Sequence, residues 1–404
     1  MTTWLESEAR FRAADPTFKA WSDGQTEAYR KWDDQQLMNM LIFFPTGKGK
    51  TKTGLALLAE RDYQHAIVIA PLKVQDDWKR DAAVLGMTLR VETVEKFRLN
   101  NTKYPKGVPI IFDEAHKLGG HTAIGWKKLN RMATGIMAPI ILMSATPNYN
   151  DAERVFCLTA ICDTAPNRNY LQWLYDTCNT TPNYFSAIPD VDEDHPFKGR
   201  DGGALEFLVD KPWCAYIEDD ATWKAVSFRL PMQTDLVFEE YGYDSVKHRI
   251  MASDMEKRHR RVNKAFIDDD SFIRQDVWDE VTTVIRGYTN YGQWLIFCNH
   301  KTVAEALYRT STRDGLEETF LITGDTKPEA VEVSKQAFIR SEQGVLIGTT
   351  TLAEGVDGLD KTCQALLILD DIEGDPSKRR QLIGRILPRG GDDGIERLVI
   401  TATF

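Results

Sequence analysis

The chain has 404 residues, of which 42% are hydrophobic and 27% are charged, and its formal net charge is −10. This length is sufficient for two ordinary α/β domains with separate cores, so a single domain is not expected. No run of about 18 apolar residues could span a bilayer, and the charged N-terminus is unlike the apolar region of a signal peptide. These features predict a soluble, cytoplasmic protein without a membrane partner.

The cysteines are scattered, without a CxxC pair or the spacing of a zinc finger. They are Cys157, Cys162, Cys178, Cys214, Cys298 and Cys363. Six cysteines in a chain of this length are not a disulfide-dense pattern. We therefore expect reduced thiols rather than a metal site.

Short β-branched runs alternate with longer amphipathic stretches, which is typical of parallel sheets covered by helices. The predicted strands of a first block are residues 41–44, 65–70, 108–113 and 139–145. Those of a second block are residues 293–298, 319–323, 344–350, 365–370 and 397–402. The blocks repeat one scheme, so the predicted fold class is α/β with two similar domains.

The stretch between the blocks is harder to interpret. It holds an acidic, loop-like segment at 189–203, two strand-like runs, WCAYIEDD and TWKAVSFRLP, and a probable helix around residues 247–264. We place the domain boundary near Leu230 to Gln233, where the strand-like pattern meets Pro231. The expected domains are 1–230, with an inserted segment at about 150–210, and 231–404.

The run FFPTGKGKT, residues 43–51, follows a predicted strand and precedes a predicted helix. This context suits a phosphate-binding loop, in which backbone N–H groups and the helix dipole bind phosphate. Lys50 would reach the β- and γ-phosphates, and the Thr51 hydroxyl would ligate Mg²⁺. Phe44 departs from the general pattern, which has glycine there. The candidate nucleotide-binding residues of the loop are Pro45, Thr46, Gly47, Lys48, Gly49, Lys50 and Thr51.

The run VPIIFDEAH places two carboxylates where an apolar strand ends. The carboxyl ends of parallel strands border the crevice in which ligands bind. Asp113 would hold Mg²⁺ through water, and Glu114 would orient or deprotonate the attacking water.

Five motifs in order resemble motifs I, II, III, V and VI of the superfamily 2 helicases and translocases. They are PTGKGKT, DEAH (113–116), SAT (144–146), TTTLAEGVD (349–357) and QLIGR (381–385). The resemblance implies two tandem RecA-like P-loop domains with ATP in the cleft between them.

The same resemblance implies further roles for individual residues. It adds Gln381, Arg385 and Arg389 to the catalytic set, and Gln25, Gly355 and Asp357 to the nucleotide site. It assigns coupling to His116, Ser144 and Thr146, and nucleic-acid contacts to Pro71, Lys73, Thr93, Thr323, Gly324 and Thr349. The sixth motif departs from QxxGRxxR, because Pro388 stands where the second arginine belongs and Arg389 follows it. Arg385, Arg389 or both could serve as the arginine finger.

The resemblance implies an ATP-dependent, Mg²⁺-requiring DNA helicase or translocase. Features similar to restriction-enzyme motors, Swi/Snf-type translocases and compact phage helicases favour DNA over RNA, and a phage-encoded protein would act in the host cytoplasm. An RNA helicase, or a nucleotide-switched binding protein that needs a protein partner, remains open. The net charge opposes binding to a polyanion, although a locally basic groove is compatible with it. The basic run 247–264 fits either a duplex contact or a solvated helix.

Overall fold

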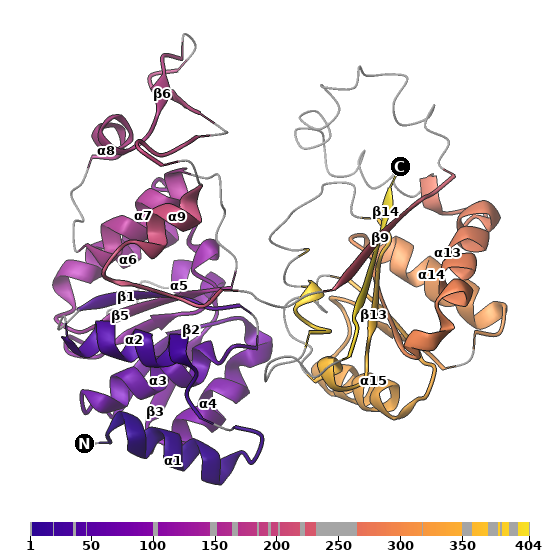
Figure 1. The fold of residues 1–404 in the computed structure, drawn as a ribbon, viewed down its shortest axis with the longest axis horizontal. Helices are drawn as coiled ribbons and strands as arrows, with labels where there is room; N and C mark the ends of the chain where they lie inside the picture. The colour runs from indigo at the N-terminus through magenta and orange to yellow at the C-terminus, as the bar shows by residue number, and fades with distance from the viewer. Residues whose placement is uncertain are drawn as a thin grey trace. The chain divides into compact units, whose positions relative to one another are not determined.

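The computed structural model describes most of the chain. It does not describe residues 1, 19, 35–37, 46, 100–103, 146–151, 164–168, 184–185, 193–194, 201–202, 219–222, 232–264, 317, 350–357, 371–378, 380–381, 388–394 and 404. The chain divides into two compact units, Met1–Asp219 and Asp220–Phe404 (Figure 1).

Six of the described strands of the first unit form a parallel sheet in the order β3-β2-β4-β5-β1-β8. Their bounds are β1 Asn39–Phe43, β2 His65–Ile69, β3 Thr88–Glu92, β4 Ile110–Phe112, β5 Ile140–Ser144 and β8 Cys214–Tyr216. Its inner strands are buried on both faces, as is usual for a parallel sheet between helices.

Helices cover both faces of this sheet (Figure 1). One face packs against α1 Trp4–Ala14, α2 Asp23–Asp34, α3 Lys50–Glu60 and α4 Gln75–Val84. The other packs against α5 Val94–Leu99, α6 Ile124–Gly135, α7 Ala152–Cys162 and α9 Ala204–Val209, and α8 Tyr170–Thr177 packs on α7. Alternate residues of β1 separate the two cores, with Leu41 and Phe43 in one and Met40 and Ile42 in the other, because strand side chains alternate between faces.

The segment expected as an insertion at about 150–210 contributes α7, α8 and α9 to the first unit. It also contains a short antiparallel pair, β6 Thr180–Thr181 with β7 Asp190–Val191.

The described strands of the second unit form another six-stranded parallel sheet, in the order β11-β12-β10-β13-β14-β9. Their bounds are β9 Lys224–Arg229, β10 Trp294–Phe297, β11 Thr319–Ile322, β12 Val345–Gly348, β13 Ala365–Ile368 and β14 Leu398–Thr403. Helices α13 Gln275–Gly287 and α14 Lys301–Arg313 pack on one face. Helix α15 Pro328–Arg340 packs on the other.

Two features differ from the sequence-based expectation. Strand β3 was not expected, and β9 belongs to the second sheet, where it pairs with β14 along its whole length. The division between the units at Asp219 therefore lies earlier than the expected boundary at Pro231. The physical reason is that the backbone of β9 has its hydrogen-bonding partner in the second unit.

The six cysteines are buried and free. Over the ranges that the structure describes, no helix is long and apolar enough to cross a membrane.

Candidate nucleotide site and motor motifs

The loop between β1 and α3 has the backbone of a phosphate-binding loop. Gly47 and Gly49 have φ values of +82° and +76°, in the left-handed region that glycine adopts at little cost. Gly49 is the N-cap of α3, so the first amides of this helix face the loop. A Cβ atom at Gly49 would also lie 2.5 Å from Nε2 of Gln25. The left-handed backbone favours glycine at position 49, and a Cβ there would also displace the amide end of the Gln25 side chain.

Lys50 lies folded over this loop. Its Nζ donates to the carbonyl oxygens of Phe44 at 2.9 Å and Pro45 at 3.3 Å. An ammonium group held here can exchange these neutral acceptors for phosphate oxygens, which form stronger, charge-assisted hydrogen bonds.

Gln25 lies on α2 against the start of α3 and is only 5% exposed. Its Nε2 donates to Thr53 Oγ1 at 3.0 Å, and its Oε1 accepts from the Ser22 backbone N–H at 2.9 Å. The structure therefore brings Gln25 to the phosphate loop, as the expected nucleotide contact requires, with its amide hydrogen-bonded within the protein.

Asp113 directly follows β4 and is 9% exposed. Its two carboxylate oxygens accept from Trp78 Nε1 at 3.2 Å and from the Glu114 backbone N–H at 3.0 Å. Burial, reinforced by the charge of Glu114, raises the pKa of Asp113 to about 6, although Lys50 acts in the opposite direction. A divalent cation beside this carboxylate would favour its ionised form.

Glu114 has a φ of +56°, a strained value for a residue with a side chain. Its Oε2 lies 3.2 Å from His116 Nδ1 but makes no hydrogen bond to any residue that the structure describes. This buried carboxylate oxygen has acceptor capacity for a further donor, such as a water.

His116 connects the second and third motifs. Its Nδ1 lies 3.4 Å from the Oγ of Ser144, the last residue of β5. Because β4 and β5 are parallel neighbours, their carboxyl ends lie at the same edge of the sheet. The structure thus brings His116 and Ser144 together, as a coupling role requires.

The loop and the carboxylate pair fit a magnesium–nucleotide complex. The left-handed glycines, the helix N-terminus and Lys50 suit phosphate groups, and Thr51 stands in the first turn of α3. Asp113, together with the incompletely bonded Glu114 carboxylate, suits a hydrated cation and a reacting water.

The expected nucleic-acid contacts of the first unit also follow strand ends. Pro71 begins the short helical turn η1, Leu72–Val74, after β2. Thr93 follows β3, and its Oγ1 accepts from the Lys96 backbone N–H at 3.2 Å. Thr93 therefore helps to cap α5, whatever further contact it makes. The side chain of Lys73 lies outside the described part.

In the second unit, Thr323 follows β11 and Thr349 follows β12. Both side chains are buried, whereas Gly324 is exposed. The Thr349 N–H donates to Ile322 O at 3.2 Å, which joins the two strand ends. These residues are thus brought to one edge of the second sheet.

The sixth motif has an apolar side that packs against the second sheet. Its buried residues are Leu382, Ile383, Ile386 and Leu387. Between them, Gly384 and Arg385 are half-exposed. The apolar anchors therefore fix a short segment that carries the candidate finger Arg385.

Several candidate residues lie outside the described residues. They are Thr46, Thr146, Gly355, Asp357, Gln381 and Arg389, together with the basic run 247–264.

Sequence reasoning missed one buried polar cluster. Asp370 follows β13 and is 0% exposed; it accepts from the backbone N–H groups of Asn299 and His300 and lies 3.0 Å from His300 Nδ1. The signal was available, because ALLILD ends an apolar strand in aspartate as VPIIFD does. This carboxylate fixes the turn between β10 and α14.

Comparisons with known proteins agree with this architecture. Residues 277–390 match the family described as "Helicase conserved C-terminal domain". No curated protein matches the chain in sequence.

Among solved structures, S. cerevisiae Dbp5 bound to RNA and ADP BeF3 has a TM-score of 0.56 at 15% identity, covering 100% of this chain and 90% of its own. The DUF1998 helicase MrfA bound to DNA and AMPPNP has a TM-score of 0.56 at 14% identity, covering 98% of this chain. The present chain spans about half of MrfA, 50% of its length. The Sulfolobus solfataricus SWI2/SNF2 ATPase core in complex with dsDNA is less similar, with a TM-score of 0.40, 11% identity and coverage of 95% and 88%.

The family match lies within the second unit, and the likeness to Dbp5 and MrfA shows a fold of two tandem RecA-like domains. In fold, the chain is similar to solved nucleic-acid helicases.

Proposed function

We propose that this protein is a nucleic-acid-dependent ATPase that couples Mg-ATP hydrolysis to movement on, or remodelling of, DNA. The observation that carries the proposal is the site of the first unit. There the charge of Lys50, on the glycine loop, acts to lower the pKa of Asp113, and Glu114 follows Asp113 at the end of β4. Phosphate-binding and water-activating groups thus occur together.

Each residue has a role that its surroundings support. Lys50 and the amides at the start of α3 bind the phosphates. Thr51 and Asp113 would hold Mg²⁺, which supplies charge compensation when bound. Glu114 accepts a proton from the attacking water at its incompletely bonded Oε2. Arg385 of the second unit would stabilise the charge that develops on the γ-phosphate.

A locally basic surface on the first unit supports nucleic-acid binding despite the net charge of −10. It is formed by α5, the turn η2 Ala115–Leu118 and α6. Its basic residues are Lys96, Arg98, Lys117, Lys127 and Arg131, and Glu95 is the only acidic residue on the two helices. These elements are neighbours, because Arg98 donates to the Lys117 carbonyl and Lys128 Nζ to the Phe97 carbonyl at 2.6 Å. Such a surface attracts phosphate backbones irrespective of sequence.

DNA is the proposed track because the motifs around residues 70–78, 349–357 and 381–389 are similar to those of DNA translocases. RNA is the alternative, and Dbp5, which is bound to RNA, has the same fold. A protein partner that supplies specificity is compatible with either.

The test is steady-state ATP hydrolysis without nucleic acid and with single-stranded DNA, duplex DNA, forked DNA and RNA, at low and moderate salt. Stimulation by DNA supports the proposal. Stimulation by RNA alone would replace DNA with RNA, and absence of hydrolysis under all conditions would refute the ATPase assignment. Lys50→Ala is the control, because it removes the phosphate-binding cation and should abolish nucleotide binding.

Strand displacement and triplex displacement, measured in parallel, separate the two motor types. A duplex translocase removes a third strand without opening the duplex, whereas an unwinding helicase separates the duplex. The Arg385→Ala and Arg389→Ala variants identify the finger, because loss of turnover with retained nucleotide binding is expected only for the arginine that reaches the phosphate.

A further inference from the structure

A buried arginine lies at the start of the last strand of the second unit. Arg397 immediately precedes β14, is 2% exposed and is among the largest fully buried side chains of the described chain. Burying a guanidinium costs free energy unless its donors are satisfied. The hydrogen bonds of Arg397 therefore indicate what this burial achieves.

Among the residues that the structure describes, its donors reach backbone carbonyls in three segments. Nε donates to Ile386 O at 2.6 Å, one terminal nitrogen to Ile395 O at 3.0 Å, and the other to Asp360 O at 3.1 Å. The fixed fork of a guanidinium is suited to such divergent acceptors, whereas a lysine would present one point charge.

Two of these acceptors belong to candidate motor segments. Ile386 is the residue after Arg385, within the segment whose apolar side is buried against the sheet. Asp360 lies in η4, Leu359–Lys361, which follows the fifth motif at 349–357. The guanidinium thus joins the ends of two motifs to the strand that supports both. We call this set of three hydrogen bonds the Arg397 bridge.

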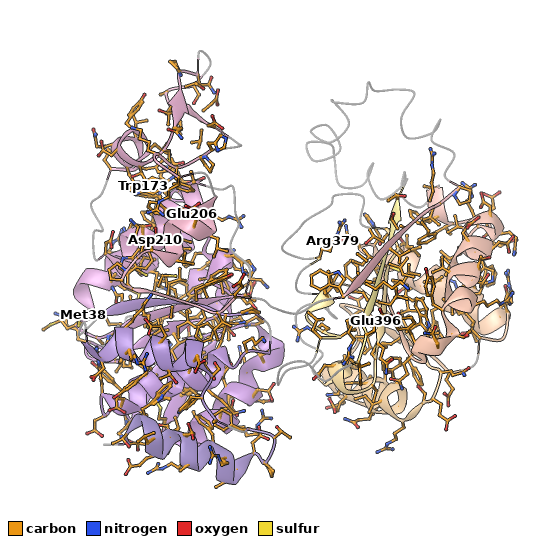
Figure 2. All side chains as sticks on the ribbon, in the orientation of Figure 1. Met38, Trp173, Glu206, Asp210, Arg379 and Glu396 are labelled. Carbon is orange, nitrogen blue, oxygen red and sulfur yellow. The ribbon has the colours of Figure 1, made fainter. Side chains whose placement is uncertain are left out.

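The residue before Arg397 is fixed independently. Glu396, labelled in Figure 2, accepts a hydrogen bond from the Tyr291 hydroxyl in the same unit. Burial and this carboxylate raise the pKa of Tyr291 to about 12, so the hydroxyl keeps its proton at neutral pH. Side-chain hydrogen bonds thus hold the chain at two consecutive residues, Glu396 and Arg397, just before β14.

We propose that Arg397 is a positioning residue for Arg385, holding the backbone of the finger segment so that its guanidinium can act on nucleotide. The expected effect on turnover rests on the proposed function. The Arg397 bridge itself does not depend on that function. A displacement of about 1 Å at a catalytic group can lower a rate by up to about a hundredfold, so loosening this backbone should reduce turnover.

The first experiment measures amide hydrogen exchange in wild type and in Arg397→Lys, which keeps the charge and loses the fork. Exchange should accelerate at residues 382–387 and 359–363 and remain unchanged in β10 and β13. The matched control is Arg313→Lys, the same substitution at a surface ion pair with Asp314 on α14. Unchanged exchange in both segments of Arg397→Lys would overturn the proposal.

The second experiment measures kcat and KM for ATP in Arg397→Lys. The concentration of folded protein is determined from the number of nucleotide-binding sites. We expect kcat to fall about ten- to a hundredfold with little change in KM. In an Arg385→Ala background the same substitution should have almost no further effect, because the residue acts through Arg385. An equal fall in both backgrounds would show a general structural role and contradict the proposal.

If Arg397→Lys does not fold, Tyr291→Phe provides the test. It removes the hydrogen bond to Glu396 and should accelerate exchange at the same two segments to a smaller extent, with a smaller fall in kcat. No change in either quantity would overturn the proposal. A wild-type protein that does not hydrolyse ATP would refute the proposed function, whereas the exchange experiment still decides whether the bridge holds the segment.

Discussion

At the scale of single residues, the carboxylate pair combines opposing requirements. Asp113 must be ionised to hold a cation, yet its burial beside Glu114 disfavours the ionised form and raises its pKa to about 6. Under the proposed function, a bound cation would favour the ionised carboxylate, and the unfavourable ionisation of Asp113 would lower stability in its absence.

The first prediction concerns Asp113→Asn without nucleotide and with a chelator present. Because the folded-state pKa lies above the ordinary value of 3.8, the carboxyl ionises more readily in the unfolded state, and wild type loses stability as the pH rises from about 4 to about 6. The loss is complete above about pH 6 and absent below about pH 3, where Asp113 is protonated in both states. The variant should therefore be more stable at pH 8, by about 3 kcal/mol at most, and equal to wild type near pH 3.

Urea unfolding at the two pH values measures this difference. Lower stability of the variant at pH 8 would show that the wild-type carboxylate is favourably ionised in the folded state.

The second prediction concerns Glu114→Gln. The amide keeps the shape of the side chain but cannot accept a proton from water, so nucleotide binding should persist while kcat falls by about a hundredfold or more. Equilibrium binding of a fluorescent ATP analogue and steady-state hydrolysis measure the two quantities. Hydrolysis at the wild-type rate would remove Glu114 from the mechanism.

At the scale of elements, the phosphate loop depends on how α3 begins. Gly49 combines a left-handed backbone with a close approach to Gln25, so the loop is fixed by α2 as well as by its own sequence. The motif was predictable from sequence, because its residues are adjacent in the chain. The family resemblance assigned Gln25 to the nucleotide site, but its contacts with Gly49 and Thr53 depend on how α2 packs against α3 and were not predicted.

The third prediction compares two glycine substitutions. Gly49→Ala should destabilise the protein by about 1–3 kcal/mol, through strain at positive φ and the clash with Gln25, and should weaken nucleotide binding. Gly135→Ala, at the end of α6 where a Cβ meets nothing within 4 Å, should be neutral or slightly stabilising. Thermal unfolding and nucleotide titration measure both variants. Equal effects on stability and binding would show that neither the positive φ of Gly49 nor its contact with Gln25 matters.

Elements with a continuous apolar run were predictable as strands, whereas β3, which has no such run, was missed. The central strands of both sheets are buried throughout, so their sequences are mostly apolar. Strand β3, TLRVE, has only its last residue buried. Strand β9 lies in the strand-like run TWKAVSFRLP, but its exposed and half-buried residues do not indicate which sheet it joins. Edge strands of this kind lack the run that identifies a buried strand.

At the scale of the whole molecule, the assignment of residues to units could not be derived from local pattern. Strand β9 precedes every other strand of its sheet in the chain and pairs with the last one, β14. The Arg397 bridge likewise joins residues 360, 386 and 397, whose proximity depends on the complete sheet. Such relationships follow from topology rather than from motif spacing.

The fourth prediction concerns fragments of the second unit. A fragment of residues 220–404 should fold, because it contains β9. A fragment of residues 231–404 should be less stable and prone to aggregation, because the edge of β14 loses its partner and exposes unpaired N–H and C=O groups.

Circular dichroism, thermal unfolding and light scattering distinguish the two fragments. If the two fragments were equally stable and soluble, the second unit would not need β9 to fold, and its boundary could lie at Pro231.

The pairing of β9 with β14 also bears on the order in which the protein assembles during synthesis. The strands of the first unit all precede residue 220, so its sheet can close while the rest of the chain is still being translated. In the second unit, β9 emerges first but has no neighbour until β14 leaves the ribosome. The nascent chain therefore carries an unpaired strand throughout the synthesis of the second unit, and in this interval the N–H and C=O groups of β9 are open to non-native pairing.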